Sequence, residues 1–409
     1  MSKKSPQLRF EGFTDDWEVR KLGSLTTVVR GASPRPIQDP KWFDKESDIG
    51  WLRIADVTEQ NGRIYHLEQH ISKLGQEKTR VLTEPHLLLS IAATVGKPVV
   101  NYVKTGVHDG FLIFLNPTFE REFMFQWLEM FRPKWQKYGQ PGSQVNLNSE
   151  LVRNQEIVLP NYKEQQKIGS FFKHLDNTIA LHQRKLDLLK EQKKGFLQKM
   201  FPKNGAKVPE LRFAGFADDW EERKLSSGLR EYTDRVIVED DKEYYQISVR
   251  NNFGGITLRG SKMGNKIGRK RQAKINLTKY PQTLIFTRQT VEQGGIGWVD
   301  KYCDGAIVTE NMPTISLDTS VFSKYFLTNL FQTRIFYKNA ILDNIEGGSA
   351  QIAIHESKFL SSTLLFPNLD EQEKIGQFFK QLDDTIDLHQ RKLDLLKEQK
   401  KGFLQKMFV

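Results

Sequence analysis

One block of this chain occurs twice without a single change. Leu181 to Phe201 reads LHQRKLDLLKEQKKGFLQKMF, and Leu388 to Phe408 repeats it letter for letter, 207 positions later in a chain of 409 residues. A long internal repeat at a fixed separation indicates a repeated architecture. The chain is therefore a tandem duplication, and a fold assigned to one half must also serve the other half.

Both copies extend upstream as related segments, EQQKIGSFFKHLDNTIA from Glu164 and EQEKIGQFFKQLDDTID from Glu371. Apolar side chains recur along each at alternating steps of four and three, which is the heptad pattern of a coiled coil. We expect the two helices to form an antiparallel coiled coil within the chain. The predicted seam consists of Ile168, Phe172, Leu175, Ile179, Leu186 and Leu189, and of Ile375, Phe379, Leu382, Ile386, Leu393 and Leu396.

The predicted helices have recognisable ends. Asn161 and Asn368 each follow a proline and stand three residues before a glutamate, a pattern that resembles a capping box with Asn as the N-cap. Pro202 ends the first helix, because proline cannot continue it.

A second repeat precedes each globular region. PQLRFEGFTDDWEVRKL starts at Pro6, and PELRFAGFADDWEERKL starts at Pro209. The order of opening segment, globular region and helix thus occurs twice, with a pseudo-twofold relation between the copies. We predict an opening segment and first globular domain over 1–160, a helix over 161–205, a second opening segment and globular domain over 206–367, and a second helix over 368–409.

The two globular regions differ in sequence but share a plan. Each has short runs that read as strands, WLRIADV and HLLLSIAATV in the first and YYQISVR and TLIFTRQTV in the second. One amphipathic helix is predicted near residues 118–138 and one near 320–340. Short strands combined with helices indicate an α/β (α+β) fold. Each region continues with a Gly-Ser turn, at Gly142 or Gly348, and a last strand that ends at Pro160 or Pro367.

The composition favours a folded protein of two to four domains, with 38% apolar and 11% aromatic residues. No apolar run is long enough to span a membrane, and Met1 to Pro6 has no apolar segment behind it that would indicate a signal peptide. The single cysteine, Cys303, excludes a disulfide framework and a cysteine-based zinc site. We expect a cytoplasmic protein.

The net charge of +11 indicates a polyanionic partner, and its distribution is uneven. Tyr244 to Lys301 contains 11 Lys and Arg residues but only Glu292 and Asp300 as acids. Lys41 to Leu115 balances nine basic against nine acidic residues. Charge alone therefore predicts a nucleic-acid site in the second half more strongly than in the first.

The tandem layout, the repeated RFxGFxDDWExRKL opening, the EQxKIGxFFKxLDxTI segment and the heptad helices together resemble the specificity subunit of a bacterial type I restriction-modification enzyme. The resemblance covers nearly the whole chain. It implies two target-recognition domains, each reading one half of a bipartite double-stranded DNA site, with a coiled coil as spacer. It also implies partner chains that dock here: methyltransferase subunits, expected as two copies, and restriction/translocase subunits. The S-adenosylmethionine, ATP and Mg²⁺ of such a system are expected on those partners.

The chain lacks sequence motifs for catalysis. We find no phosphate-binding G-x-x-x-x-G-K-[ST] loop, no Gly-rich turn suited to S-adenosylmethionine and no convincing metal cluster. Gly294 to Gly297 is the nearest approach to a nucleotide loop, but β-rich residues follow it, which favours a hairpin turn. We predict a noncatalytic chain without a cofactor of its own.

The second domain contains the best DNA-binding candidates. Specific recognition needs cations on phosphates and forked side chains on base edges. Interleaved glycines would let a flexible basic loop approach the duplex, although the alternative is a solvated loop that maintains solubility. The candidates are Arg250, Asn252, Arg259, Lys262, Lys266, Arg269, Lys270, Arg271, Lys274 and, at the end of the strand TLIF, Arg288.

The first domain is assigned to DNA mainly through the duplication and the resemblance. Arg and amide side chains can make bidentate base contacts, but any surface loop contains such residues, so an ordinary structural role is at least as probable for each one. The candidates are Arg53, Asn61, Arg63 and Lys97, with residues 140–148 as a further loop. Two rival functions stay open: a stand-alone regulator of a bipartite operator, and an enzyme with an unrecognised active site.

Overall fold

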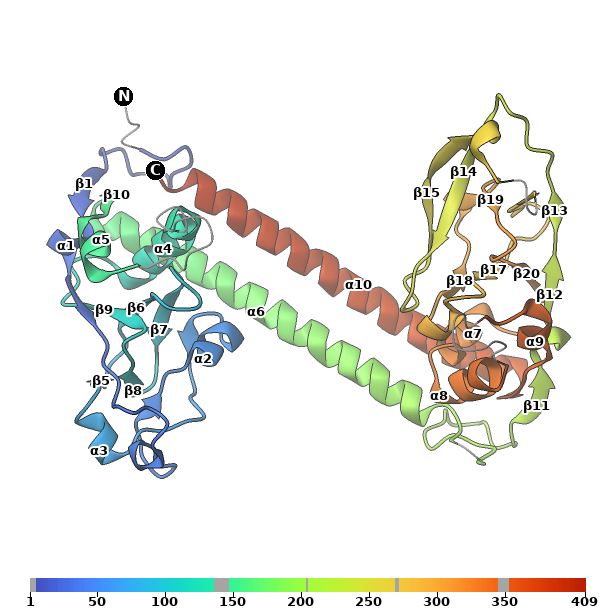
Figure 1. The fold of residues 1–409 in the computed structure, drawn as a ribbon, viewed down its shortest axis with the longest axis horizontal. Coiled ribbons are helices and arrows are strands. Elements are labelled where there is room, and N and C mark those ends of the chain that lie inside the picture. The colour runs from blue at the N-terminus through green and yellow to red at the C-terminus, as the bar shows by residue number, and fades with distance from the viewer. Residues whose placement is uncertain (1–4, 136–146, 204, 269–271, 345–352) are drawn as a thin grey trace. The chain divides into compact units, whose positions relative to one another are not determined.

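The computed structural model describes residues 5–135, 147–203, 205–268, 272–344 and 353–409 (Figure 1). It forms two compact units: the first contains Met1–Gln183 and Arg391–Val409, and the second contains Arg184–Gln390. Two long helices, α6 (Tyr162–Lys199) and α10 (Leu369–Lys406), each have 38 residues. Each unit therefore contains one globular domain, the beginning of one long helix and the end of the other.

Within each unit the two helix segments run antiparallel. In the first unit, Phe171 of α6 meets Phe403 of α10 with ring centroids 5.1 Å apart, and one helical turn further along α6 Asp176 Oδ1 lies 2.7 Å from Lys400 Nζ. Advancing along α6 thus means going back along α10, as the antiparallel prediction requires. The same two contacts recur in the second unit as Phe378 with Phe196, at 5.0 Å, and Asp383 with Lys193, at 2.7 Å.

The predicted seam residues lie on the inner side of both helices. Most are fully buried, namely Ile168, Phe172, Leu186, Leu189, Ile375, Phe379, Leu393 and Leu396. The other four are half-buried, namely Leu175, Ile179, Leu382 and Ile386.

The first domain has two sheets beside a helical layer. Its larger sheet has the strand order β2-β9-β6-β7-β4, and its smaller sheet has the order β3-β8-β5. Helix α4 (Arg121–Trp135) packs its buried aromatic face into the core with the start of α6. The strands are β2 (Thr27–Arg30), β3 (Gly50–Trp51), β4 (Arg63–Ile64), β5 (Arg80–Leu82), β6 (Leu87–Ser90), β7 (Pro98–Asn101), β8 (Thr105–Val107) and β9 (Phe111–Leu115), and the short helices are α1 (Leu22–Leu25), η1 (Pro40–Trp42), α2 (Ile54–Glu59), α3 (Lys73–Gln76) and α5 (Ser149–Asn154).

Within the described residues, the second domain repeats this plan with one strand lost and two gained. Its first sheet, β12-β20-β17-β18, has no partner in the place of β4, and its second sheet, β13-β16-β19-β14-β15, has the additional strands β13 and β15. The strands are β12 (Leu229–Tyr232), β13 (Asp234–Arg235), β14 (Glu243–Val249), β15 (Ile256–Met263), β16 (Ala273–Lys274), β17 (Thr283–Phe286), β18 (Ile296–Trp298), β19 (Ile307–Val308) and β20 (Thr314–Leu317). The helical segments are η3 (Leu225–Ser227), η4 (Gly264–Lys266), η5 (Val291–Gln293), η6 (Lys301–Cys303), α7 (Lys324–Leu330), α8 (Arg334–Phe336), η7 (Tyr337–Ile341), η8 (Leu342–Asn344) and α9 (Glu356–Ser361).

The repeated opening segment joins each domain to its helix in the same way. Strand β1 (Glu18–Lys21) pairs antiparallel with β10 (Glu156–Leu159), and β11 (Glu221–Lys224) pairs in the same register with β21 (Thr363–Phe366). The opening segment also closes the end of a long helix, because the Leu8 N–H donates to the Lys406 carbonyl at 2.9 Å and the Leu211 N–H to the Lys199 carbonyl at 2.9 Å.

A buried ion pair joins the opening segment to the start of a long helix in each unit. It explains why the opening motif and the helix-start motif recur together. The Asn161 side chain accepts the Glu164 N–H at 3.0 Å, and Asn368 accepts that of Glu371 at 2.9 Å, so both predicted N-caps are present. The glutamate does not complete a capping box. Instead, fully buried Glu164 receives a two-pronged ion pair from Arg9, at 2.6 and 2.7 Å, and Glu371 receives the same pair from Arg212.

Aromatic rings fill the space beside these ion pairs. Trp17 is 2% exposed and packs on Phe123, while Phe123 packs on Phe408 with centroids 5.3 Å apart. The second unit has the same cluster, with Trp220 on Phe326 and Phe326 on Phe201 at 5.4 Å. Burial of such rings contributes a few kcal/mol each, so these clusters are the main apolar attachment between domain and helices.

The structure corrects two local predictions and confirms a third. WLRIADV is not a continuous strand: β3 stops at Trp51 and helix α2 begins at Ile54, because the Asp56 carboxylate accepts the Arg53 N–H and starts a helix there. The helix expected near 320–340 is broken into α7, α8 and the π-helix η7, because the side-chain oxygen of Thr333 accepts the Phe336 N–H and begins a new helix. The residues after Gly294 form β18, so the hairpin interpretation is confirmed and the nucleotide loop is wrong. The two Gly-Ser turns lie outside the described residues.

Candidate nucleic-acid interface

The basic window of the second domain forms a two-stranded ribbon, which replaces the flexible loop expected from its glycines. Strands β14 and β15 pair antiparallel from Glu243–Met263 to Val249–Ile256. The register shifts beside Gln246, where the facing Gly260 has φ of +134°, a conformation that favours glycine. This irregularity bends and twists the ribbon. Figure 1 shows that its η4 end lies away from α7, α8 and α9.

One strand of the ribbon is almost entirely exposed. Arg259, Lys262 and, in the following turn, Lys266 are exposed, and none of them has an ion pair with another described residue. Tyr245 on β14 is 56% exposed and Leu258 on β15 is 36% exposed. Free cations and exposed apolar side chains on a narrow ribbon are suited to phosphates and base edges in a DNA groove.

The turn of the ribbon presents two further candidates in a fixed conformation. Asn252 and Phe253 have positive φ, and their N–H groups donate to the carbonyls of Gln293 and Gly294 at 2.7 and 2.9 Å. The side chains of Arg250 and Asn252 remain exposed. The structure therefore brings Arg250, Asn252, Arg259, Lys262 and Lys266 onto one ribbon.

The other second-domain candidates have different surroundings. Arg288 is 17% exposed and donates from Nε and Nη2 to Glu356 Oε2 at 2.9 and 2.6 Å, which fastens β17 to α9. Burial alone would raise the pKa of Glu356, but hydrogen bonds and Arg288 lower it. Lys274 is half-buried on β16, inside the sheet. Arg269, Lys270 and Arg271 lie outside the described residues.

In the first domain, Arg53 lines a cavity of about 710 Å³. Its guanidinium is held by Asp56 at 2.8 Å and by Glu68 at 3.1 Å, and the hydrogen bond that Arg53 donates to Asp56 raises the pKa of Arg53. A guanidinium oriented by two carboxylates is preorganised for a bidentate contact. The other lining side chains, which the sequence did not single out, include Arg35, Gln38, Trp51, His108 and Asp109.

The lining of the cavity includes both charged and aromatic side chains. Arg35 Nη2 lies 3.2 Å from Asp109, and a hydrogen bond from Ser33 lowers the pKa of Asp109. Burial lowers the pKa of His108, whose ring lies 5.9 Å from that of Trp51. These residues come from segments separated by up to 76 positions in sequence, so no local motif could reveal that they meet.

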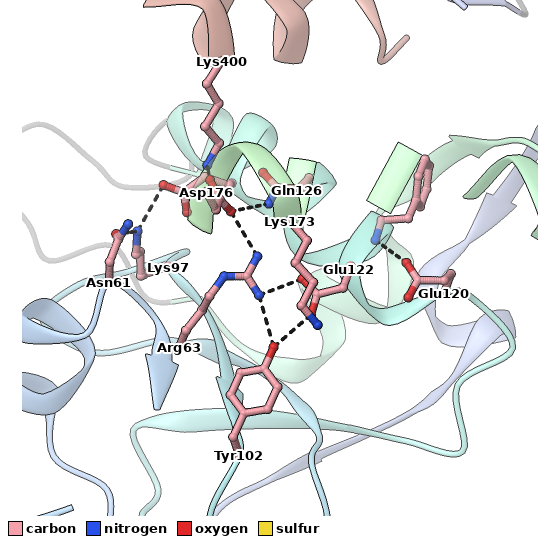
Figure 2. Close-up of polar contacts among 12 residues, drawn as sticks. Asn61, Arg63, Lys97, Tyr102, Glu120, Glu122, Gln126, Lys173, Asp176 and Lys400 are labelled. Carbon is pink, nitrogen blue, oxygen red and sulfur yellow. Dashed lines mark hydrogen bonds and ion pairs between the residues drawn. The ribbon is translucent and has the colours of Figure 1, made fainter. Parts of the chain in front are cut away.

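The remaining first-domain candidates point into the protein. Arg63 is 8% exposed and makes ion pairs with Glu122, at 2.7 Å, and Asp176, at 3.0 Å (Figure 2). Lys97 donates to exposed Asn61 at 2.8 Å and to Glu129 at 3.2 Å. Burial lowers the pKa of Lys97. Of these three residues only Asn61 is exposed, with a side-chain oxygen already bonded to Lys97.

Among the residues that the structure describes, no cluster of His, Cys, Asp and Glu could hold a metal ion. No helix within the described ranges is long and apolar enough to cross a membrane.

The comparisons with known proteins agree with this duplicated architecture. Residues 14–191 and 218–398 each match the family described as type I restriction modification DNA specificity domain. The Type I restriction enzyme MjaVIII specificity subunit of Methanocaldococcus jannaschii is 21% identical over 410 residues, covering 95% of this chain and 91% of that protein. The S subunit of a Type-I restriction-modification system from M. genitalium has the same fold, with a TM-score of 0.62, 12% identity and 99% of both chains covered. A chain from a structure of type I R-M complex assembly and conformational transition has a TM-score of 0.50 and 14% identity. The match covers 96% of this chain and 97% of that chain.

The chain belongs to the type I restriction-modification DNA specificity family, because the family match covers most of both halves. It is a specificity subunit with two DNA specificity domains and is the noncatalytic component of such a system. The resemblance inferred from the repeated motifs is thereby confirmed.

Proposed function

We propose that this subunit reads a bipartite, asymmetric DNA site, with one recognition domain on each half-site. The division is that predicted from the repeats: domains over 1–160 and 206–367 read DNA, and helices over 161–205 and 368–409 separate them. The proposal rests on one contrast. The framework around Arg9 and Arg212 is duplicated almost contact for contact. By contrast, of the two strands in the exposed ribbon β14–β15, only β14 has a counterpart among the described residues of the first domain, in the two-residue strand β3.

The ribbon is the proposed reader of the second half-site. A two-stranded ribbon fits the major groove of B-DNA, where each base pair presents a distinct set of donors, acceptors and methyl groups. Arg250, Asn252, Arg259, Lys262 and Lys266 are its proposed DNA contacts. Arg269, Lys270 and Arg271 remain proposed contacts of the same domain, whereas the positions of Lys274 and Arg288 favour structural roles.

The cavity around Arg53 is the proposed reader of the first half-site. Arg35 and Gln38 join Arg53 there, and such side chains can recognise guanine and adenine edges by paired hydrogen bonds. Asn61, which is exposed outside the cavity lining, is a weaker candidate of the same domain. Arg63 and Lys97 are left out, because their side chains are only 9% and 12% exposed and their cationic groups are engaged by acidic partners, whereas the side chain of Arg53 is 36% exposed.

The partners follow from the family. We propose that two methyltransferase subunits dock on the duplicated helices, that restriction/translocase subunits join through them, and that S-adenosylmethionine, ATP and Mg²⁺ bind to those partner chains in the cytoplasm. Identical outer helix surfaces suit identical partners, since Leu181 to Phe201 and Leu388 to Phe408 do not differ.

Sequencing of methylated DNA from cells that express this chain with its methyltransferase tests the proposal. The expected result is a methylated adenine in each half of an asymmetric motif, with a fixed number of unspecified base pairs between the halves. A methylated continuous palindrome would overturn the bipartite assignment. Failure to copurify with a methyltransferase chain would instead favour a stand-alone regulator.

A further inference from the structure

A buried ionic joint connects the first recognition domain to both long helices (Figure 2). At its centre Asp176 of α6 is reached by three groups: Lys400 Nζ of α10 at 2.7 Å, Arg63 Nη2 of β4 at 3.0 Å, and Gln126 Nε2 of α4 at 2.8 Å. Asp176 is 13% exposed, and Arg63 is 9% exposed at its side chain. The sheet edge, the domain helix and both coiled-coil helices thus meet at one carboxylate.

A second carboxylate extends the joint. Glu122 of α4 accepts from Arg63 at 2.7 Å and from the Tyr102 hydroxyl at 2.9 Å, and Lys173 of α6 lies 3.6 Å from it. Arg63 therefore bridges Glu122 and Asp176 with its two terminal nitrogens. Burial alone would lower the pKa of Arg63, but these two carboxylates outweigh it, so the guanidinium stays charged.

The second unit keeps the helix pair of this joint without the link to the sheet. Asp383 is equivalent to Asp176 and makes its ion pair with Lys193, at 2.7 Å, but it has no other ion pair within the described residues and is 37% exposed. Asn329 occupies the position of Gln126, and its amide donates to the Tyr325 carbonyl of its own helix at 2.8 Å. As far as the structure describes the second domain, its corresponding sheet ends at β18 and has no strand in the place of β4, the strand that carries Arg63.

Stability alone gives a poor reason for this joint. Buried ion pairs often contribute little net free energy, because desolvation offsets their attraction, but forked contacts restrict geometry. Both units already have the same aromatic cluster and the same Arg-Glu pair to hold domain and helices together. The ionic joint also fixes the orientation of the domain relative to the helices, because side chains from β4, α4 and α10 contact Asp176 at the same time.

We propose that Arg63, Asp176 and Lys400 are positioning residues that fix the angle of the first recognition domain on the paired helices and thereby the spacing at which its half-site is read. This inference rests on the proposed bipartite recognition. One added base pair moves a half-site by about 3.4 Å along the duplex and rotates it by roughly a tenth of a turn. A domain held at one angle rejects that shift, whereas a loosened domain follows it.

The test uses the full chain in complex with its methyltransferase. Binding is measured to duplexes that carry the wild-type site and to duplexes with the spacer one base pair longer or shorter. The variants are Asp176→Asn, which keeps the shape and removes the charge, and Lys400→Gln, a milder change for the case that the first does not fold. Asp383→Asn and Lys193→Gln are the matched controls in the second unit.

The readout is the ratio of affinities for the correct and the altered spacers, because a loss of folded protein lowers both affinities and cancels in the ratio. We expect this ratio to fall roughly tenfold in Asp176→Asn and less in Lys400→Gln. A tenfold fall corresponds to a loss of about 1.4 kcal/mol in the binding free energy that discriminates between the spacers. The two controls should keep the wild-type ratio.

An unchanged ratio in folded Asp176→Asn or Lys400→Gln, or an equal fall in the controls, would overturn the positioning role. Failure of the proposed function looks different, because the wild-type complex itself would then show no preference between spacers.

Discussion

The two units share a framework and differ in what they attach to it. Arg9 and Arg212 make the same forked contact with a buried glutamate, and Trp17 and Trp220 occupy the same aromatic cluster. Beyond that framework, the first domain has the edge strand β4 with its ionic joint, and the second has the ribbon β14–β15. Duplication has therefore preserved the attachment to the helices, while the surfaces available for recognition have diverged.

The largest expected effect tests the shared framework. Arg9→Met and Arg212→Met each leave a fully buried glutamate without its cation, so each should lower the free energy of unfolding by about 3–5 kcal/mol. Denaturant unfolding of each variant measures the loss. Similar losses would confirm that the two frameworks are equivalent, and a large loss in only one would break the comparison.

A glycine in each helix tests the close approach of domain to helix. A Cβ at Gly169 would lie 2.7 Å from the Phe123 nitrogen, and one at Gly376 would lie 2.7 Å from the Phe326 nitrogen. Gly169→Ala and Gly376→Ala should each cost about 1–3 kcal/mol in thermal or denaturant unfolding, because the neighbour is backbone and cannot yield easily.

Gly195→Ala and Gly402→Ala are the controls in the same helices, since no atom lies within 4 Å of either added Cβ. Alanine is the better helix former, so these two variants should gain up to about 1 kcal/mol. Destabilisation of the controls as well would refute the packing explanation.

The exposed basic side chains of the ribbon test the proposed difference in DNA contacts between the two domains. Replacing Arg259 and Lys262 by Ala should weaken DNA binding by roughly tenfold. It should also lower the slope of log affinity against log salt concentration by the amount expected for the loss of about two phosphate contacts. Fluorescence anisotropy at several salt concentrations gives both quantities. Exposed Lys338, in the helical layer of the same unit, is the control, and an equal effect of Lys338→Ala would mean that only overall charge matters.

The smallest effect is a pH dependence of the ionic joint. Burial alone would raise the pKa of Asp176, but Lys400 and Arg63 lower it below its ordinary value. A carboxylate with a lowered folded-state pKa stabilises the protein above its unfolded pKa and loses this contribution as the pH falls through the folded value. The stability difference between wild type and Asp176→Asn should thus be constant near neutral pH and shrink below about pH 4.

This loss is limited to about 1.4 kcal/mol per pH unit for one group. Denaturant titrations at each pH measure it for wild type, Asp176→Asn and Lys338→Ala. A difference between wild type and Asp176→Asn that does not change in acid would contradict the role of the charge.

The repeated features could be predicted from sequence because periodicity and identity are local properties. The heptad steps predicted the two long helices, and the positions of Asn161 and Asn368 predicted their N-caps. The pairing of Arg9 with Glu164 was missed, although both lie in motifs that recur together, because no separate pattern links positions 155 residues apart. Joint recurrence of the two motifs was the available signal.

The non-repeated features were harder to predict because tertiary contacts decide them. Arg53 looked like part of a strand, but the Asp56 carboxylate begins a helix beside it. Arg63 and Lys97 were predicted to contact DNA from their residue type, in a domain assigned to DNA through the duplication and the resemblance. The structure surrounds their cationic groups with acidic side chains from α4 and α6. Basic residue type identifies a possible phosphate ligand, but only the fold shows whether the protein already uses it.

The hydrogen bond from the Leu8 N–H to the Lys406 carbonyl has a consequence for where the ends of the chain can be placed by circular permutation. The same bond joins Leu211 to Lys199 inside the chain, so the first opening segment stands beside the last helix as if the chain continued from one into the other. Each unit therefore has an equivalent junction between an opening segment and a helix end, formed within one continuous stretch in the second unit and between residues far apart in sequence in the first. A circular permutant with the present ends linked, and new ends between Lys203 and Gly205, should keep every contact of both helix ends.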